Sequence, residues 1–158
     1  MKKFFTHYWS NETWKTHSKQ QGEPLGHTAG NQFRKRGASP GDSICVLTIQ
    51  AGRLFLLGRM VVDRVCSKKE AEKLLGIDDL WNAEEHILAS TATPKDFTLE
   101  VPVKVAKRLR FITSSKSKTL RFVDDTHLDK QTLRSVRQLE PASASFLDEL
   151  LPPNTSAQ

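Results

Sequence analysis

Two tryptophans near the N-terminus flank short polar side chains that could contact a bound ring. Trp9 and Trp14 enclose Ser10 and Asn11, directly after an aromatic-rich segment of the kind that forms strands. An indole face can stack on a planar ligand, and a hydroxyl or an amide can hydrogen-bond to the edge of that ligand. The alternative is that Trp9 belongs to the core and Trp14 covers a long loop. Trp81 is a third candidate wall, although a tryptophan in a predicted helix more often packs in the interior.

A second group of candidate residues combines amides with cations. Asn31 and Gln32 each offer a donor and an acceptor, which suits the edge of a base. Arg34, Lys35 and Arg36 follow and could bind phosphate, for which arginine has a bidentate geometry. Asn31 could instead cap the helical turn predicted here, and the three cations could form only a solvated surface.

The 158-residue chain has a net charge of +6, which is unevenly distributed. Residues 1–41 contain seven Lys and Arg against two acidic residues, and residues 101–123 contain seven against none. A basic face favours a polyanionic partner, because Lys and Arg that neutralise phosphates release bound counterions. We therefore expect a nucleic-acid partner, DNA or RNA, with a merely solvated surface as the alternative. The candidate phosphate-binding residues of the second segment are Arg108, Arg110, Lys116 and Lys118.

No pattern in the sequence predicts a catalytic, metal or cofactor site. None of the five histidines lies in an H-E-x-x-H motif or beside a nucleophile elbow, and no glycine-rich loop is followed by Lys-Ser or Lys-Thr. Cys45 and Cys66 have no second cysteine pair or suitably spaced histidines to complete a zinc site. We expect them to be buried thiols in a reducing compartment, with no bound metal or cofactor.

The distribution of apolar residues is that of one globular domain. No stretch reaches the roughly 18 apolar residues that a membrane span needs, and polar residues after position 6 interrupt the short apolar run at the N-terminus. The sequence predicts a cytoplasmic protein with no membrane partner.

Apolar periodicity predicts an α+β fold rich in strands. Residues 43–50 and 54–64 form the two strands of a predicted hairpin, and both faces of the first are apolar, so it should be central in its sheet. Gly58 suggests a bulge or the close approach of another backbone. The other predicted elements are a strand over 3–9, an irregular stretch over 10–30, a capped helix over 67–75, a helix over 79–88, a strand over 97–105, and strands over 109–112 and 119–123.

The apolar period changes towards the C-terminus. Apolar residues between 128 and 139 recur at helical spacing, and Pro141 can open a further helix that runs to Leu151. We expect a principal domain over residues 1–125, a helical extension over 126–151 packed on it, and a disordered tail over 152–158.

Three segments carry a resemblance to a known family. Tyr8 and Trp9 end the first predicted strand, a helical stretch follows over residues 31–36, and Gly41 and Asp42 open the next strand. In this order the segments resemble the EVE branch of the PUA-like superfamily, which also contains the ASCH and YTH domains. The helical stretch departs from the R-N-x-x-A-R pattern of that branch at two of its positions. The likeness covers residues 3–112, and the C-terminal segment over 133–141 is more faintly similar to the helical tail of some EVE-like proteins.

The resemblance implies a small mixed β pseudo-barrel with short peripheral helices, a helical C-terminal tail and a cavity beside the first strand. In related modules this cavity takes a flipped base, often a modified one, against an aromatic side chain. An extruded base must regain its stacking from aromatic faces, and its edge must be read by polar groups. The residues expected to bind the base are Trp9, Ser10, Asn11, Trp14, Asn31, Gln32 and Trp81.

Two other functions stay open. ASCH-type relatives hydrolyse modified nucleosides with a lysine and an acidic residue, and Lys15 or Lys35 with Glu12 could serve here. The protein could also be an adaptor that binds another protein through the helices predicted over residues 128–151. No catalytic residue is assigned, and nucleic-acid binding is the first hypothesis.

Overall fold

An eight-stranded sheet organises the chain, for which a computed structural model describes residues 1–113 and 117–156. The strands are β1 (Phe4–Tyr8), β2 (His27–Gly30), β3 (Ser43–Gln50), β4 (Arg53–Cys66), β5 (Glu85–Ala92), β6 (Phe111–Ile112), β7 (Val136–Leu139) and β8 (Thr155–Ser156). Their order is β2-β5-β4-β3-β1-β7-β6, and β8 pairs with β5. β1 runs parallel to β3, and the other pairs are antiparallel. The combination of this sheet with short helices confirms the predicted α+β class. Within the described residues the sheet does not close, so the predicted barrel is not confirmed.

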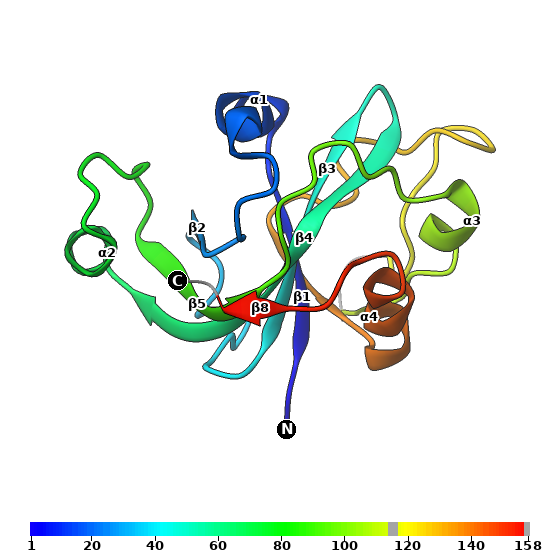
Figure 1. Cartoon of the computed structure of the whole chain (residues 1–158). Helices are drawn as coiled ribbons and strands as arrows, with labels where there is room; N and C mark the ends of the chain where they lie inside the picture. The colour runs from blue at the N-terminus through cyan, green and yellow to red at the C-terminus, as the bar shows by residue number, and fades with distance from the viewer. Residues whose placement is uncertain (114–116, 157–158) are drawn as a thin grey trace.

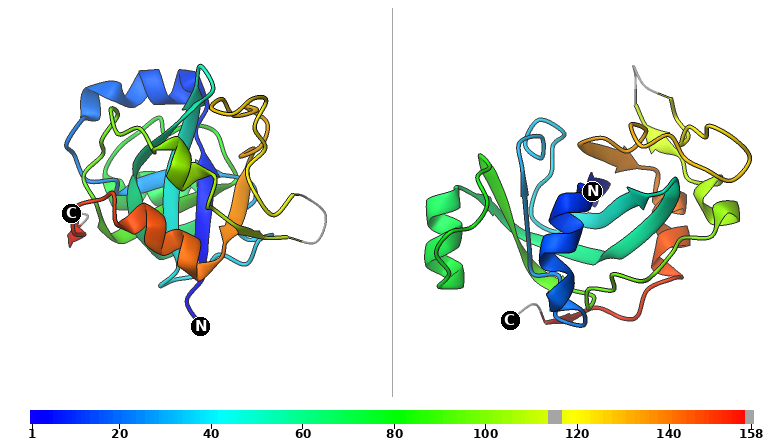
Figure 2. Two further views of the ribbon diagram at one scale, coloured as in Figure 1. Left: turned by 90° about the vertical axis from the view of Figure 1, so that its right-hand side faces the viewer. Right: turned by 90° about the horizontal axis from the view of Figure 1, so that it is seen from above.

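Short helices stand around the curved sheet (Figure 1). They are α1 (Asn11–His17), the 3-10 turn η1 (Ser18–Gln20), α2 (Lys68–Leu75), α3 (Val103–Ala106) and α4 (Pro141–Asp148). Seen from above, α2 lies at one end of the molecule, α3 and α4 lie at the other, and α1 lies between them (Figure 2). The predicted helix over 67–75 is confirmed, because Ser67 accepts from the backbone of Glu70 and Gly76 ends the helix at φ +66°.

The predicted hairpin is confirmed as β3 and β4, which pair from Ser43 opposite Val61 to Gln50 opposite Arg53. The register shifts between Val46 and Leu47, opposite Gly58 and Leu56, so a bulge lies where the glycine predicts one. A Cβ at Gly58 would lie 2.6 Å from Thr93 Oγ1, so the close neighbour here is a side chain, and the backbone oxygen of Pro94 lies 3.5 Å away.

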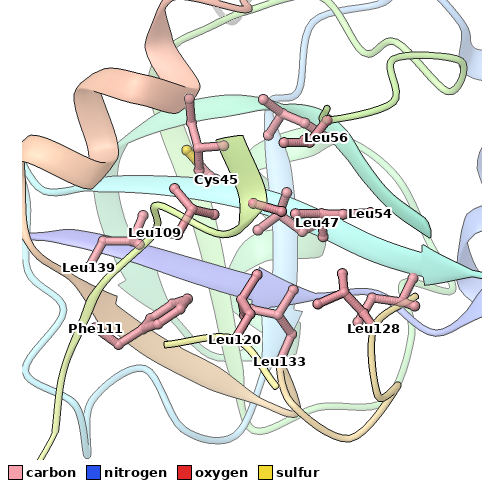
Figure 3. Packing of buried hydrophobic residues seen from close by; sticks show 14 of the residues in the cluster. Cys45, Leu47, Leu54, Leu56, Leu109, Phe111, Leu120, Leu128, Leu133 and Leu139 are labelled. Atoms are coloured by element: carbon pink, nitrogen blue, oxygen red, sulfur yellow. The ribbon is translucent and has the colours of Figure 1, made fainter. Parts of the chain in front are cut away.

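The two faces of the sheet bury two separate apolar clusters. One contains Cys45 and Leu47 of β3, and residues from 101 to 151 fold over it (Figure 3). The other contains Ile44 and Val46 of β3 together with Phe5. Successive side chains of a strand point to opposite faces, so apolar residues on both faces of β3 are what a strand buried on both faces requires. Each such aliphatic or aromatic side chain contributes about 1.5–3 kcal/mol when fully buried.

Long-range pairing overrides several sequence predictions. The helix predicted over 79–88 is wrong, because residues 85–88 belong to β5 and pair between β2 and β4. The helix predicted over 128–139 is also wrong, because Val136–Leu139 form β7 between β1 and β6. The strand predicted over 97–105 is wrong, because this segment contains an isolated bridge at Glu100 and then α3. The stretch from 10 to 30, predicted to be irregular, contains α1, η1 and β2. Residues 119–123 take part only in isolated bridges.

The C-terminal part of the chain is built into the sheet. Residues 126–151, predicted as a helical extension, contribute β7 as well as α4, which agrees with the helix predicted from Pro141. Thr155–Ser156, in the tail predicted to be disordered, pair with Thr91 and Ala92 of β5. The described helices include none with the length and apolar character needed to span a bilayer.

Candidate functional site

A recess of about 380 Å³ opens beside the end of β1. Its walls come from α1 and η1, from the chain entering β2, from the loop after α2, and from the segment after β5. In Figure 1 these segments lie around the space between α1 and α2. The volume falls within the range of about 300–1,000 Å³ that is common for small-molecule sites.

Aromatic rings form one side of the recess, and Trp81 is at the centre of them. Its ring centroid lies 5.8 Å from Trp9, 5.2 Å from His17 and 5.0 Å from His27. The two indoles are nearly perpendicular, at 88°. This edge-to-face contact leaves no room for a ring between them, so a planar ligand could stack on one indole face but not be sandwiched.

Trp9 is held rigidly in the recess wall. Its indole Nε1 donates to Thr28 Oγ1 at 2.9 Å, its backbone N–H donates to Leu47 at 2.9 Å, and its carbonyl accepts from Thr48 Oγ1 at 2.6 Å. Only 3% of the residue is exposed. Trp9 therefore offers a fixed apolar surface rather than a hydrogen-bonding group.

Trp81 is only partly buried and lies on the loop between α2 and β5. Three contacts fasten this loop: Leu80 N–H donates to Glu72 Oε2 at 3.1 Å, Glu84 N–H to Asn31 Oδ1 at 2.9 Å, and Lys68 Nζ to Asn82 Oδ1 at 2.8 Å. The loop thus holds Trp81 against Trp9 while leaving part of its ring accessible.

Polar groups enter the recess from the side of Lys95. This lysine is 9% exposed, and its Nζ donates to Gln20 Oε1 at 2.6 Å. Burial lowers the pKa of Lys95, while the nearby Glu23 carboxylate acts in the opposite direction. The recess therefore contains an ammonium, an amide and a carboxylate close together.

His27, in the recess wall, is uncharged at neutral pH. Burial lowers the pKa of His27 to about 3, and positive charge on His86, His17 and Lys95 adds to the effect. His27 Nε2 and His86 Nδ1 lie 2.8 Å apart, so one ring nitrogen donates a hydrogen bond and the other accepts it. Neutral, stacked imidazoles extend the aromatic surface instead of adding a cationic one.

The residues predicted around the first indole are separated by the structure. Trp9 lines the recess, whereas Trp14 is 4% exposed and packs against Phe55 and Phe97 in the core. Ser10 caps α1 by accepting from Thr13 N–H at 3.2 Å. Trp14 and Ser10 are outside the recess lining, because the helical turn that follows β1 points them away from it.

The predicted amides are engaged elsewhere. Asn11 Oδ1 lies 3.4 Å from Thr48 Oγ1, and Asn31 Oδ1 holds Glu84 rather than capping a helix. The backbone carbonyl of Gln32 accepts from Arg36 in a single turn. None of the three amides lines the recess, while Trp81, the third predicted wall, does.

The predicted phosphate-binding cations lie outside the recess. Arg34, Lys35 and Arg36 are exposed on the turn after β2, and Arg34 Nη2 also donates to Val65 O at 3.2 Å. The recess itself is lined by one cation, Lys95, and by two carboxylates, those of Glu23 and Asp79. The sequence led us to expect a cationic surface next to the cavity, and these lining residues do not supply one.

The second basic segment is exposed but partly engaged. The Arg108 guanidinium stacks on Phe146 at 4.0 Å, and Arg110 donates its backbone N–H to Ser143 Oγ at 2.8 Å. Lys118 is exposed, and Lys116 lies outside the described residues. These positions leave charged groups at the surface while their stems or backbones hold the fold.

Sequence reasoning missed most of the polar lining. His17, Gln20, Glu23 and His27 come from one stretch of the chain, Lys95 comes from a distant one, and together they follow no recognisable motif. The one available signal was the long polar stretch after β1, which is unusual in a compact domain and often functional.

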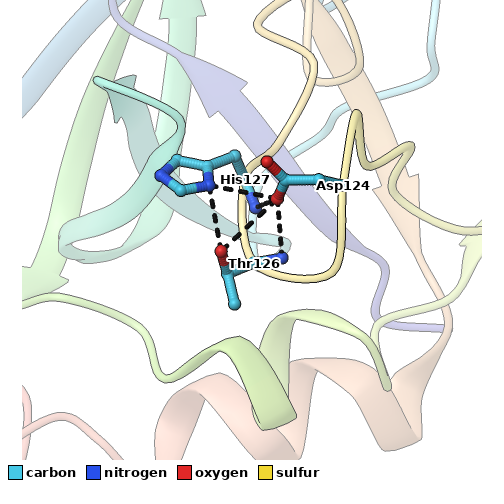
Figure 4. A network of polar contacts seen from close by, with 3 residues as sticks. All are labelled: Asp124, Thr126 and His127. Atoms are coloured by element: carbon cyan, nitrogen blue, oxygen red, sulfur yellow. Dashed lines mark hydrogen bonds and ion pairs between the residues drawn. The ribbon is translucent and has the colours of Figure 1, made fainter.

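One surface network has the residue types of a catalytic triad but not its geometry. Asp124, Thr126 and His127 lie together on a loop (Figure 4). His127 Nδ1 lies 3.0 Å from Asp124 Oδ1 and 2.9 Å from Thr126 Oγ1, so both partners share one ring nitrogen. A proton relay needs the acid on one nitrogen and the hydroxyl on the other. The network closes a turn, and its hydrogen bonds lower the pKa of Asp124.

The described residues contain no group of three or more His, Cys, Asp or Glu side chains placed to hold a metal ion. Cys45 and Cys66 are buried free thiols, and burial raises the pKa of Cys45 to about 12. Comparisons with known proteins found no matching family model, curated protein or solved structure.

Proposed function

We propose that the protein binds nucleic acid, DNA or RNA, and takes one nucleobase into the recess beside Trp81. The observation that carries this proposal is a partly exposed indole in a recess of about 380 Å³, backed by a second, rigid indole and by the uncharged imidazole of His27. A base that leaves its stack regains about 1–3 kcal/mol by stacking on an aromatic face.

The fold supports the same proposal. The arrangement of a first strand parallel to β3, the β3–β4 hairpin and a recess beside the end of β1 is consistent with a PUA-like pseudo-barrel of the EVE type. In that fold the base, often a modified one, enters beside the first strand, which is where Trp9 lies.

The phosphate backbone would contact exposed cations at some distance from the base. Lys68 is one such cation, because its Nζ donates to Oδ1 of Asn82, the residue after Trp81. The turn at Arg34, Lys35 and Arg36 and the segment containing Arg108, Arg110 and Lys118 would extend this contact. Such phosphate contacts position the strand and carry no sequence information of their own.

The direct test is binding of labelled single-stranded DNA and RNA oligonucleotides over a range of salt concentrations. We expect affinity to fall steeply as salt rises, because phosphate neutralisation releases counterions. Absence of binding at low salt, or binding that does not respond to salt, would contradict the proposal. An apolar protein–protein contact would show the second behaviour.

One observation favours a second candidate function, hydrolysis of a modified nucleoside. Lys15, Lys35 and Glu12, the residues first considered for such chemistry, are exposed and do not line the recess, whereas Lys95 and Glu23 do. Burial lowers the pKa of Lys95, which favours the neutral amine that acts as a base or nucleophile. Incubation with acylated and methylated nucleosides, followed by chromatography, tests this candidate. Recovery of unchanged nucleosides would contradict the hydrolase candidate and would leave the binding proposal unaffected.

The adaptor hypothesis has no comparable support. Residues 128–139, expected to supply a helix for a partner, form turns and β7. In α4, Ala144 and Leu147 are already buried in the apolar cluster of Figure 3.

A further inference from the structure

Two opposite charges lie side by side in the recess without pairing with each other. The backbone N–H of Lys95 donates to the backbone carbonyl of Glu23 at 2.8 Å, and the backbone N–H of Gly22 donates to the carbonyl of Lys95 at 2.9 Å. The segments that contain Glu23 and Lys95 therefore run together like a short β-ladder. Both side chains line the recess. Among the ion pairs of the described residues, neither Lys95 nor Glu23 takes part.

The surroundings fix what each charge can do. The Lys95 ammonium is buried and has three N–H donors, one of which is directed to Gln20 Oε1. The Glu23 carboxylate is exposed to solvent and only accepts hydrogen bonds. A ligand edge that satisfies both must have an acceptor for the lysine next to donors for the glutamate.

We propose that the recess reads the Watson–Crick edge of a guanine-type base, with Glu23 accepting from N1–H and the 2-amino group and Lys95 donating to O6. The inference rests on the proposed function and names the base that this site prefers. Guanine is the standard base that places one acceptor beside two adjacent donors, which match the two oxygens of one carboxylate. Hydrogen bonds to charged groups are the strong ones.

The other bases fit less well for stated reasons. Adenine turns its amino donor towards the ammonium and its N1 acceptor towards the carboxylate, so both contacts become repulsive. Uracil keeps a carbonyl and one N–H but has no second donor for the carboxylate. Hypoxanthine keeps O6 and N1–H and lacks only the 2-amino group, so it isolates that single contact.

Burial makes the discrimination at Lys95 steep. Lys95 as a residue is only 9% exposed, so its ammonium gains little from water, and a ligand without an acceptor leaves its charge poorly compensated. A purine also covers more of the Trp81 face than a pyrimidine, which favours guanine over uracil through stacking as well.

The test is titration of the whole protein with GMP, IMP, AMP and UMP by calorimetry. The four nucleotides carry the same phosphate, so differences in affinity report the base. We expect GMP to bind tightest, IMP to bind roughly ten-fold more weakly, and AMP to bind weakest. Equal binding of all four, or tightest binding of AMP or UMP, would overturn the guanine assignment and leave base binding intact. No binding of any nucleotide, together with no binding of oligonucleotides, would instead overturn the proposed function.

Variants connect the preference to its residues. Glu23→Gln should bring the affinities for GMP and IMP close together, because the amide cannot accept from both donors. Glu12→Gln, on the exposed face of α1, is the matched control and should keep the difference. Lys95→Met removes the ammonium from a side chain of similar length, and it should weaken the binding of GMP more than the binding of AMP. A GMP preference that survives both Glu23→Gln and Lys95→Met in folded protein would contradict the assignment.

Discussion

The side-chain hydroxyl of Thr28 accepts a hydrogen bond from the indole Nε1 of Trp9 at 2.9 Å. Indole N–H is only a donor, so the hydroxyl must direct its own proton elsewhere. His7 Nδ1 lies 3.0 Å away and is the available acceptor. The three side chains join the end of β1 to β2, with a buried, neutral His7 ring as the acceptor for the Thr28 proton.

Acid should therefore destabilise the protein through His7. Burial lowers its pKa from 6.5 to about 4, so between these values the unfolded chain binds a proton that the folded chain does not. Stability is unaffected by this group above pH 6.5 and falls as the pH drops towards about 4, by up to about 1.4 kcal/mol per pH unit. Urea unfolding at several pH values measures the slope.

A matched pair of variants isolates that slope. His7→Asn keeps an acceptor for Thr28 but cannot titrate, so the decline between pH 6.5 and 4 should become shallower by about one proton. Ser90→Ala, at an exposed position of β5, removes no titrating group and should leave the slope in this range unchanged. An unchanged slope in His7→Asn would show that His7 is not the group responsible.

The partly exposed Trp81 and the buried Trp14 should separate binding from folding. Trp81→Ala removes a partly exposed stacking surface and should weaken oligonucleotide binding by about 1–3 kcal/mol with little change in Tm. Trp14→Ala removes a core side chain packed on Phe55 and Phe97, and should cost about 3–5 kcal/mol of stability. Any Trp14→Ala protein that folds should bind normally. Anisotropy titrations and thermal melts of both variants check this, and equal binding by Trp81→Ala and the unmodified chain would count against stacking.

Sequence-local features were predictable because neighbouring residues determine them. The β3–β4 hairpin follows from two apolar runs joined by three residues with Gly52 at φ +78°, and α2 follows from its own caps. β5 and β7 were missed because their conformation depends on partners 20 or more residues away, at β4 and β1. The helical spacing of apolar residues in 128–139 did not determine the structure, because residues 136–139 pair with the edge of β1.

The recess was only half predictable for the same reason. Trp9 and Trp81 stand out by residue type alone, since few roles other than core packing need an indole. Lys95 and Glu23 enter the recess because two extended segments, 72 positions apart, hydrogen-bond to each other. Nothing in the local sequence of either residue indicates that pairing.

Phosphate contact should be visible in the salt dependence of binding. Arg36 is exposed on the turn after β2, and Arg36→Ala should weaken all oligonucleotide sequences alike. The slope of log Kd against log salt should decrease by about 0.7–0.9, the value of one phosphate contact. Lys130→Ala, an exposed cation in an acidic part of the chain, is the control and should leave the slope as it was. An unchanged salt slope in Arg36→Ala would show that Arg36 makes no phosphate contact.

The bulge in β4 should not tolerate a side chain. A Cβ at Gly58 would lie 2.6 Å from Thr93 Oγ1, which accepts from Arg59 N–H at 2.9 Å and cannot easily move. Gly58→Ala should therefore cost about 1–3 kcal/mol of stability. Ser90→Ala, at an exposed position of the adjacent strand, should have little effect in the same unfolding assay. A Gly58→Ala protein as stable as the parent would mean that the two strands can separate at no cost.

Whether a base stacks against Trp81 is most directly tested by the indole N–H signals of the three tryptophans in a ¹⁵N-labelled sample. Substitution of each tryptophan by Phe assigns the three resonances, and a single-stranded oligonucleotide is then added at low salt. The account predicts that the Trp81 signal shifts most, that Trp9 shifts with it, and that Trp14 stays in place. Saturable binding that leaves the Trp81 and Trp9 signals unmoved would contradict it.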